Sequence, residues 1–320
     1  MAGEPKMIKK LELFLLALQS TFGSGVSSLT ASDYADVEGG SSLENNLTMH
    51  DIDQTSGTFN QPAMVPGDMA ADASLIYRLR TWGDNDPGSV ANAFQCAGFV
   101  ITNLLKVYTL TPSSDCSAWK DATIWHYTGN LSAGGSLLEK ANNVMFDWEI
   151  SMPTGGIPKV TFTGVGSHVG AAINATQPTV TQDAQATKAL IGVALTVNGT
   201  VYKTIEFNIS GNQDVENTID QSATYGRDRS LVTGKGFKWT AKVYATVTGD
   251  GDPFAELLAG TLATTSISWG VAPNKWTIAS GSSKSQITSR KKSDNNGVTT
   301  FDLEGIFVDN DLTIDVDTTV

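Results

Sequence analysis

Two aspartates separated by one glycine, Asp250 and Asp252 in "TGDGDPFAELLAG", have the spacing of carboxylate ligands in a calcium-binding loop. Such a loop also needs a third oxygen ligand and a bidentate glutamate at its twelfth position, and here Pro253 follows at once. The same letters predict a helix, with Asp252 as N-cap, Pro253 in the first position and Gly260 closing Phe254–Ala259. We therefore interpret this stretch as a capped helix without a metal ion.

The same arrangement occurs earlier in the chain. "WGDNDPGSVANAFQCAG" carries Gly, Asp, Asp and Pro in the same order, and we call the separation of Gly83 from Gly249 the repeat offset. The triplet "IDQ" at Ile52 recurs at Ile219, which agrees with the repeat offset to within a single position. A chain of 320 residues is long enough for two domains, each with its own core. The repeat therefore predicts a tandem duplication, in which Ser89–Ala97 is the first short helix.

Paired carboxylates occur on two predicted strands. Asp147 and Glu149 share one face of "MFDWEI", and Asp302 and Glu304 share one face of "TTFDLEGIF", which we interpret as the matching strand. Two carboxylates can serve a glycosidase, but no aromatic residue shares these faces, and a solvated strand surface is the simpler interpretation. If equivalent strands instead line a common channel, the repeated acidic face would keep DNA from adhering to the wall.

The charge balance of the chain is acidic. The formal net charge of −12 and the pI near 4.6 argue against a protein that grips nucleic acid through phosphate contacts. One basic cluster, Arg290, Lys291 and Lys292, falls in a predicted hairpin connection. We interpret it as a solvated loop tip, or alternatively as a contact for the acidic surface of a neighbouring copy.

Catalytic and cofactor motifs are missing from the sequence. His50, His126 and His168 fall in separate segments without metal-ligand spacing. There is no nucleophile elbow, phosphate-binding loop or dinucleotide-binding glycine motif. Cys96 and Cys116 are too few for a disulfide framework and are expected to be reduced. We predict a protein that is not an enzyme and that needs neither cofactor nor metal.

Composition and pattern favour strands. The chain has 31 Gly and 10 Pro, and short alternating segments such as "SLIYRLRTW" and "ATIWHYTG" lie between turn residues. We predict an all-β fold: two β-sandwiches or partial barrels in tandem, each with one short flanking helix. The expected parts are an N-terminal arm or amphipathic helix (1–26), a first unit with a long polar loop (27–170), a linker (171–189) and a second unit (190–320).

Five segments have a recognisable order and spacing: "KKLELFLLALQSTFGS", "FQCAGF", "VYTLTPSSD", "TIWHYTGN" and "NVMFDWEISMPTGGIPKVTFTGVGS". Together they resemble the major tail tube proteins of long-tailed bacteriophages with non-contractile tails. The resemblance implies a structural subunit of the virion tail, assembled in the host cytoplasm without a membrane. Its rings would stack around a tape-measure protein, between terminator and tip proteins, and form a conduit for DNA. Duplicated members of this family form rings of three chains.

The resemblance also implies a loop that contacts the adjoining ring. By position, the first candidate is the polar segment 41–67, with Asp53, Gln54 and Phe59. Its counterpart in the second unit is the segment 212–234, and the candidate residues there are Asp220, Arg227 and Arg229.

A binding module is the alternative function. A β-sandwich adhesin or carbohydrate-binding domain would use exposed aromatic rings as sugar platforms, and Trp82, Trp125 and Trp276 are the candidates. Because Trp125 and Trp276 lie in predicted strands beside apolar residues, we expect them to pack in the core instead.

Overall fold

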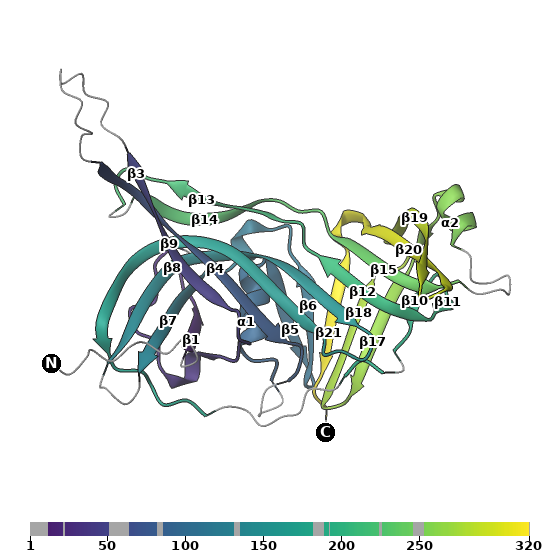
Figure 1. Cartoon of the computed structure of the whole chain (residues 1–320), viewed down its shortest axis with the longest axis horizontal. Coiled ribbons are helices and arrows are strands. Elements are labelled where there is room, and N and C mark those ends of the chain that lie inside the picture. The colour runs from purple at the N-terminus through teal and green to yellow at the C-terminus, as the bar shows by residue number, and fades with distance from the viewer. Residues whose placement is uncertain are drawn as a thin grey trace, which may run out of the picture.

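Strands dominate the chain. The computed structural model describes residues 12–21, 23–50, 64–81, 86–130, 135–181, 189–191, 193–223, 226–245 and 253–319. Within these ranges a 12-stranded sheet, a 7-stranded sheet and a two-stranded hairpin account for the architecture, with two short α-helices (Figure 1). The predicted all-β fold is confirmed. No helix in these ranges is long and apolar enough to cross a membrane.

The elements follow one another in the order that the sequence segments suggest. In the first half they are β1 (Glu12–Leu18), β2 (Tyr34–Ala35), β3 (Ser42–His50), β4 (Val65–Arg78), α1 (Ser89–Cys96), β5 (Phe99–Leu104), β6 (Val107–Pro112), β7 (Ala122–Asn130), β8 (Gly135–Pro153) and β9 (Lys159–Ala175). In the second half they are β10 (Leu195–Val197), β11 (Thr200–Tyr202), β12 (Thr204–Ser210), β13 (Asp214–Ile219), β14 (Arg227–Gly234), β15 (Lys238–Tyr244), α2 (Phe254–Ala259), β16 (Leu262–Ala263), β17 (Thr265–Val271), β18 (Asn274–Ser280), β19 (Ser285–Asn295), β20 (Val298–Phe307) and β21 (Leu312–Asp317).

The large sheet runs through both halves of the chain. Its order is β16-β19-β20-β15-β12-β8-β7-β1-β2, and β9, β4 and β3 continue from the other edge of β8. The long strand β8 makes this possible, because its first part pairs with β7 and its last five residues pair with β12. The smaller sheet, β11-β10-β17-β18-β21-β6-β5, also joins the halves, through β21 and β6.

One hydrophobic core serves both halves. On β8, Phe146, Trp148 and Ile150 are buried, and the residues between them point to the other face, as strand alternation requires. Phe237 from the second half packs edge-on against Trp148, with ring centroids 5.4 Å apart, and stacks on Phe99 at 6.0 Å. The two halves are therefore held together by apolar packing as well as by strand pairing.

A four-strand pattern occurs twice. In the first half the strand before the helix, β4, pairs with β3 and with the last strand, β9, which in turn pairs with β8. In the second half β15 pairs with β12 and β20, and β20 pairs with β19. The paths β3-β4-β9-β8 and β12-β15-β20-β19 thus have the same order, whereas the strands around them differ.

Both predicted helices are confirmed. α1 begins at Ser89 with Gly88 as N-cap, and Asp86 accepts a hydrogen bond from the Gly88 N–H at 2.7 Å. α2 ends at Ala259, and Gly260 has φ +61°, the left-handed conformation of a C-cap glycine. Asp250 and Asp252, which have the spacing of calcium ligands, lie outside the described residues. Residues 154–156 form the turn between β8 and β9.

The expected N-terminal helix is wrong for residues 12–18, which form β1. Its four consecutive apolar residues are all buried, Phe14 and Leu16 in the main core and Leu13 and Leu15 in a second cluster on the other side. A strand covered on both faces needs a continuous apolar run, which sequence alone cannot distinguish from a short helix.

Strands also occur among the described residues of two segments that were expected to be mostly loop. The polar segment 41–67 contains β3 and the start of β4, and the segment 212–234 contains β13 and β14. β9 continues to Ala175, into the predicted linker. The stretch "SLENNLTMHDI" in the first segment suggests a strand, and β3 confirms it. Backbone pairing in a hairpin does not require an apolar pattern, so polar residues did not reveal β13 and β14.

Candidate functional site

The four predicted carboxylates lie on one face of the large sheet. Residues that lie opposite one another in neighbouring strands share a face of the sheet. Glu149 lies opposite Ser210, Ser210 lies opposite Lys238, and Lys238 lies opposite Ile306, so these four residues are on one face. Alternation along β20 then places Asp302 and Glu304 on the side of Ile306, and alternation along β8 places Asp147 beside Glu149. We call this side, opposite the core, the polar face.

The two acidic pairs are not counterparts in the pairing order, contrary to expectation. Asp147 and Glu149 lie on β8, whereas Asp302 and Glu304 lie on β20, whose place corresponds to that of β9. Their common face therefore comes from the continuity of the sheet across both halves.

The polar face carries both signs of charge. One row across four strands reads Glu206, Lys242, Asp302 and Lys291, so that each charge lies opposite its counter-charge. Lys238 also points to this side. Alternating charges in neighbouring strands stabilise the ladder by a few tenths of a kcal/mol to about 1 kcal/mol per pair. The expected wall of uniform negative charge is therefore broken by lysines.

Asp147 is covered, in contrast to Glu149. The backbone N–H of Gln213 donates a hydrogen bond of 3.0 Å to Asp147 Oδ1. Burial raises the pKa of Asp147, and this hydrogen bond opposes the increase. Glu149, two residues further along β8, is exposed. A groove of about 450 Å³ adjoins Asp147 between the β3–β4 and β13–β14 hairpins, and Glu44 and Asp72 also line it.

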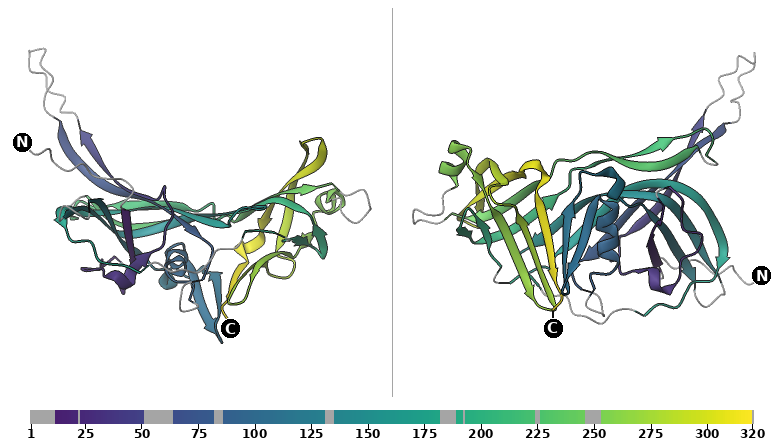
Figure 2. Two further views of the ribbon diagram at one scale, coloured as in Figure 1. Left: turned by 60° about the horizontal axis from the view of Figure 1, so that its bottom comes forward. Right: turned by 180° about the vertical axis from the view of Figure 1, so that it is seen from behind.

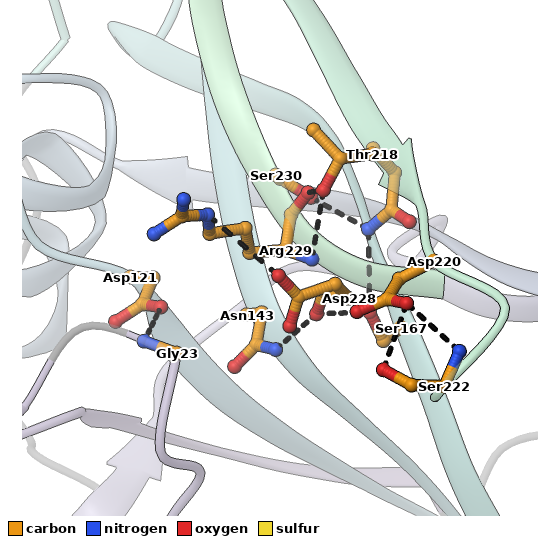
Figure 3. Close-up of polar contacts among 11 residues, drawn as sticks. Gly23, Asp121, Asn143, Ser167, Thr218, Asp220, Ser222, Asp228, Arg229 and Ser230 are labelled. Carbon is orange, nitrogen blue, oxygen red and sulfur yellow. Dashed lines mark hydrogen bonds and ion pairs between the residues drawn. The ribbon is translucent and has the colours of Figure 1, made fainter. Parts of the chain in front are cut away.

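The β13–β14 hairpin lies across β8 and β9 of the first half (Figures 1 and 3). The carbonyl of Asp228 accepts hydrogen bonds from Asn143 Nδ2 and from Ser167 Oγ, the latter at 2.8 Å. Inside the hairpin the buried amide of Asn217 donates to Ser230 Oγ at 3.0 Å, and Ser230 Oγ donates in turn to the Val165 carbonyl of β9. These contacts fix a second-half hairpin on a first-half surface.

Apolar contacts and one ion pair complete this attachment. Val232 and Val215 pack with Met145 and Trp119 in a small cluster under the hairpin. Arg227 Nε lies 2.6 Å from Asp68 Oδ2, so that β14 is tied to β4. Arg227, a candidate for ring stacking, is thus used inside the chain.

The other stacking candidates have different environments. Asp220, exposed at the turn after β13, accepts hydrogen bonds of 2.8 Å from the Ser222 N–H and hydroxyl, and these bonds lower its pKa. Arg229 Nε lies 3.7 Å from Asp228 Oδ2 on its own strand. Asp53, Gln54 and Phe59 lie outside the described residues.

Contrary to expectation, the basic cluster is part of strand β19 and does not form a loop tip. Arg290 places its guanidinium carbon 3.9 Å from the centroid of the Phe301 ring, on the core side. Lys291, opposite Asp302, points to the polar face, and Lys292 points the other way. Because the strand is half exposed, alternating charged residues are accommodated within it.

The remaining candidates are mostly structural. Trp276 is fully buried and Trp125 is half-buried under the ammonium of Lys140, so neither forms an open sugar platform; Trp82 is outside the described residues. Cys96 is buried and Cys116 is exposed, and both are free thiols. No group of three or more metal-ligating side chains occurs in the described ranges.

Sequence reasoning missed the residues that attach the hairpin. Asn143, Ser167 and Gln213 meet partners that are distant in the sequence, as Asn143 meets Asp228 and Gln213 meets Ala97. No local pattern marks such contacts, because they depend on the register of several strands. Comparisons with protein-family models and with curated proteins find no match for this chain.

Proposed function

We propose that the protein is a structural subunit of a phage tail tube, which polymerises into stacked rings and forms the conduit for DNA. One observation carries this proposal: β12 of the second half continues the sheet of the first half at β8, and the same strand path occurs in both halves. A unit that already joins its own copy edge to edge can join further copies in the same way.

In this proposal the chain is a tandem duplication, and three chains supply the six units of a ring. The sequence resemblance to tail tube proteins supports the same arrangement, with a tape-measure protein inside and terminator and tip proteins at the ends. The polar face would line the lumen. Its mixed charges and negative balance would give DNA no basic surface on which to adhere.

Electron microscopy with class averaging tests this function. The purified protein, at raised concentration and without DNA, is expected to form rings with three-fold symmetry and six similar lobes, stacked into tubes. Six-fold rings of twelve lobes would retain the tube and contradict the stoichiometry. Protein that stays monomeric both alone and with a tape-measure complex would contradict the proposal.

A further inference from the structure

Two long strands of the large sheet, β3 and β19, each have an outer edge without a strand partner over most of its length within the described residues. β3 pairs only with β4, and the outer edge of β19 pairs with β16 only at Ser285 and Gln286. Figures 1 and 2 show β3 and β19 at opposite ends of the molecule. An unpaired edge presents backbone N–H and C=O groups to which a further strand can bind.

We infer that the β3 edge of one copy pairs, antiparallel, with the β19 edge of a second copy, with Glu44 opposite Lys291. The inference rests on the proposed function for the closure of the ring, and it names the partner surface and its register. The occupant of each edge is a second copy of this chain.

The correspondence between the halves sets the register. The repeat offset, from Gly83 to Gly249, relates β4 to β15, and it also relates the pair Ser42–Ser74 to the pair Asn208–Thr240. Following the ladders gives two parallel series: Ser42, Ser74, Thr163 and Asp147 in the first half, and Asn208, Thr240, Glu304 and Ser289 in the second. Asp147 therefore corresponds to Ser289, and Glu149 corresponds to Lys291.

Burial supports this correspondence independently of the pairing. With the same offset, three buried residues of β4 correspond to three buried residues of β15: Ala73, Leu75 and Tyr77 to Trp239, Ala241 and Val243. The core faces of the two strands are thus in phase.

We expect the junction between two chains to repeat the junction of β12 with β8 inside the chain. Within the chain, Ser210 of β12 lies opposite Glu149 of β8. Ser210 corresponds to Glu44, and Glu149 corresponds to Lys291. The same junction between two copies therefore places Glu44 opposite Lys291.

The side chains at this junction are complementary. Glu44 and Lys291 are both exposed and both belong to the polar face, so they would lie side by side with opposite charges. In the same register Ser42 would lie opposite Ser293. On the other face, the register places Lys292 opposite Leu43, where the junction inside the chain has Ile150 opposite Ile209.

The outer part of the β3–β4 hairpin offers a second observation. In Figure 2 it projects from the body, whereas β13–β14 lies along the body. Leu47, Met49 and Val65 on the projecting hairpin are 43–46% exposed. The repeat offset relates Met49 to Val215, which packs against the first half. A second copy would cover the projecting hairpin as the first half covers β13–β14.

Disulfide trapping tests the register. The chain would carry Glu44→Cys and Lys291→Cys in a Cys116→Ser background, which removes the exposed natural thiol. We expect mild oxidation to yield reducible species that end at three chains, because opposite residues in a ladder are close enough for a disulfide. The matched control pairs Glu44→Cys with Lys292→Cys, whose side chain leaves the opposite face, and it should remain unlinked.

Charge exchange provides a second variant set. Glu44→Lys alone and Lys291→Glu alone are expected to reduce assembly, and the double variant E44K/K291E to restore it. If the wild-type protein forms rings but the double-cysteine variant gives no cross-link between positions 44 and 291, the pairing is overturned and the proposed function stands. Protein that neither assembles nor cross-links would overturn both.

Discussion

Burial by neighbouring side chains changes the pKa of single polar residues in this protein. His126 lies on β7 with its ring stacked on Phe14, at a centroid distance of 4.1 Å, and Thr128 Oγ1 lies 3.2 Å from its Nε2. Burial lowers the pKa of His126 from 6.5 to about 4. The folded protein therefore keeps this imidazole neutral at pH values where the unfolded chain binds a proton.

The sign of the resulting pH dependence follows directly. Between pH 6.5 and about 4 the unfolded state binds more protons at this site, so the free energy of unfolding falls as the pH falls, by up to about 3 kcal/mol. We expect His126→Gln to lose this part of the slope. Chemical denaturation of monomeric wild-type and variant protein at several pH values measures it, and equal slopes would contradict the assignment.

At the scale of elements, the two hairpins β3–β4 and β13–β14, both in polar segments, have different surroundings. β13–β14 is held on the first half by Asn143, Ser167 and the ion pair of Arg227 with Asp68. β3–β4 extends beyond the body with apolar side chains exposed. The difference is that β13–β14 lies over β8 and β9 of the first half.

We expect Arg227→Gln to loosen β13–β14. Backbone amides of β13 and β14 should exchange hydrogen several-fold faster, because the ion pair that ties this hairpin to Asp68 of β4 is removed. The matched control is Arg229→Gln, because Arg229 pairs with Asp228 of its own strand. Hydrogen exchange followed by mass spectrometry distinguishes them, and an equal increase in both variants would argue against the anchoring role.

At the scale of the whole molecule, the polar face is continuous over both halves. Glu149 and Glu304 are exposed on it, and Asp302 is half-buried. If this face lines the lumen of a tube, the sign of its charge decides whether DNA passes freely or adheres.

Reversal of these three charges should therefore change DNA retention without preventing assembly. With Glu149, Asp302 and Glu304 replaced by Lys, tubes are expected to retain DNA at low salt and to release it as salt increases. Tubes with the same three positions changed to Gln or Asn are the control for loss of charge alone. Sedimentation with labelled DNA measures retention, and unchanged retention in the Lys variant would place the polar face outside the lumen.

Local patterns predicted a large part of the fold. Alternation identified β4, β7, β8 and β20, and turn and capping residues identified both helices, because these features depend on neighbours within a few positions. The repeat of the Gly83 segment at Gly249 located both helices, but the matching of the strand of Glu149 with the strand of Glu304 was wrong. The same local reasoning failed at β1, whose apolar run has no period, and at β13, β14 and β19, whose polar residues resemble loops.

The sequence by itself determined that this protein is all-β, where its two short helices lie, and that Trp276 packs in the core. Only the tertiary structure decided that Asp302 shares a face with Glu149, that Arg227 is tied to Asp68, and that β12 continues the sheet at β8. Such contacts join residues far apart in the chain. They depend on the register of many strands at once, and that register is fixed by the packing of one shared core.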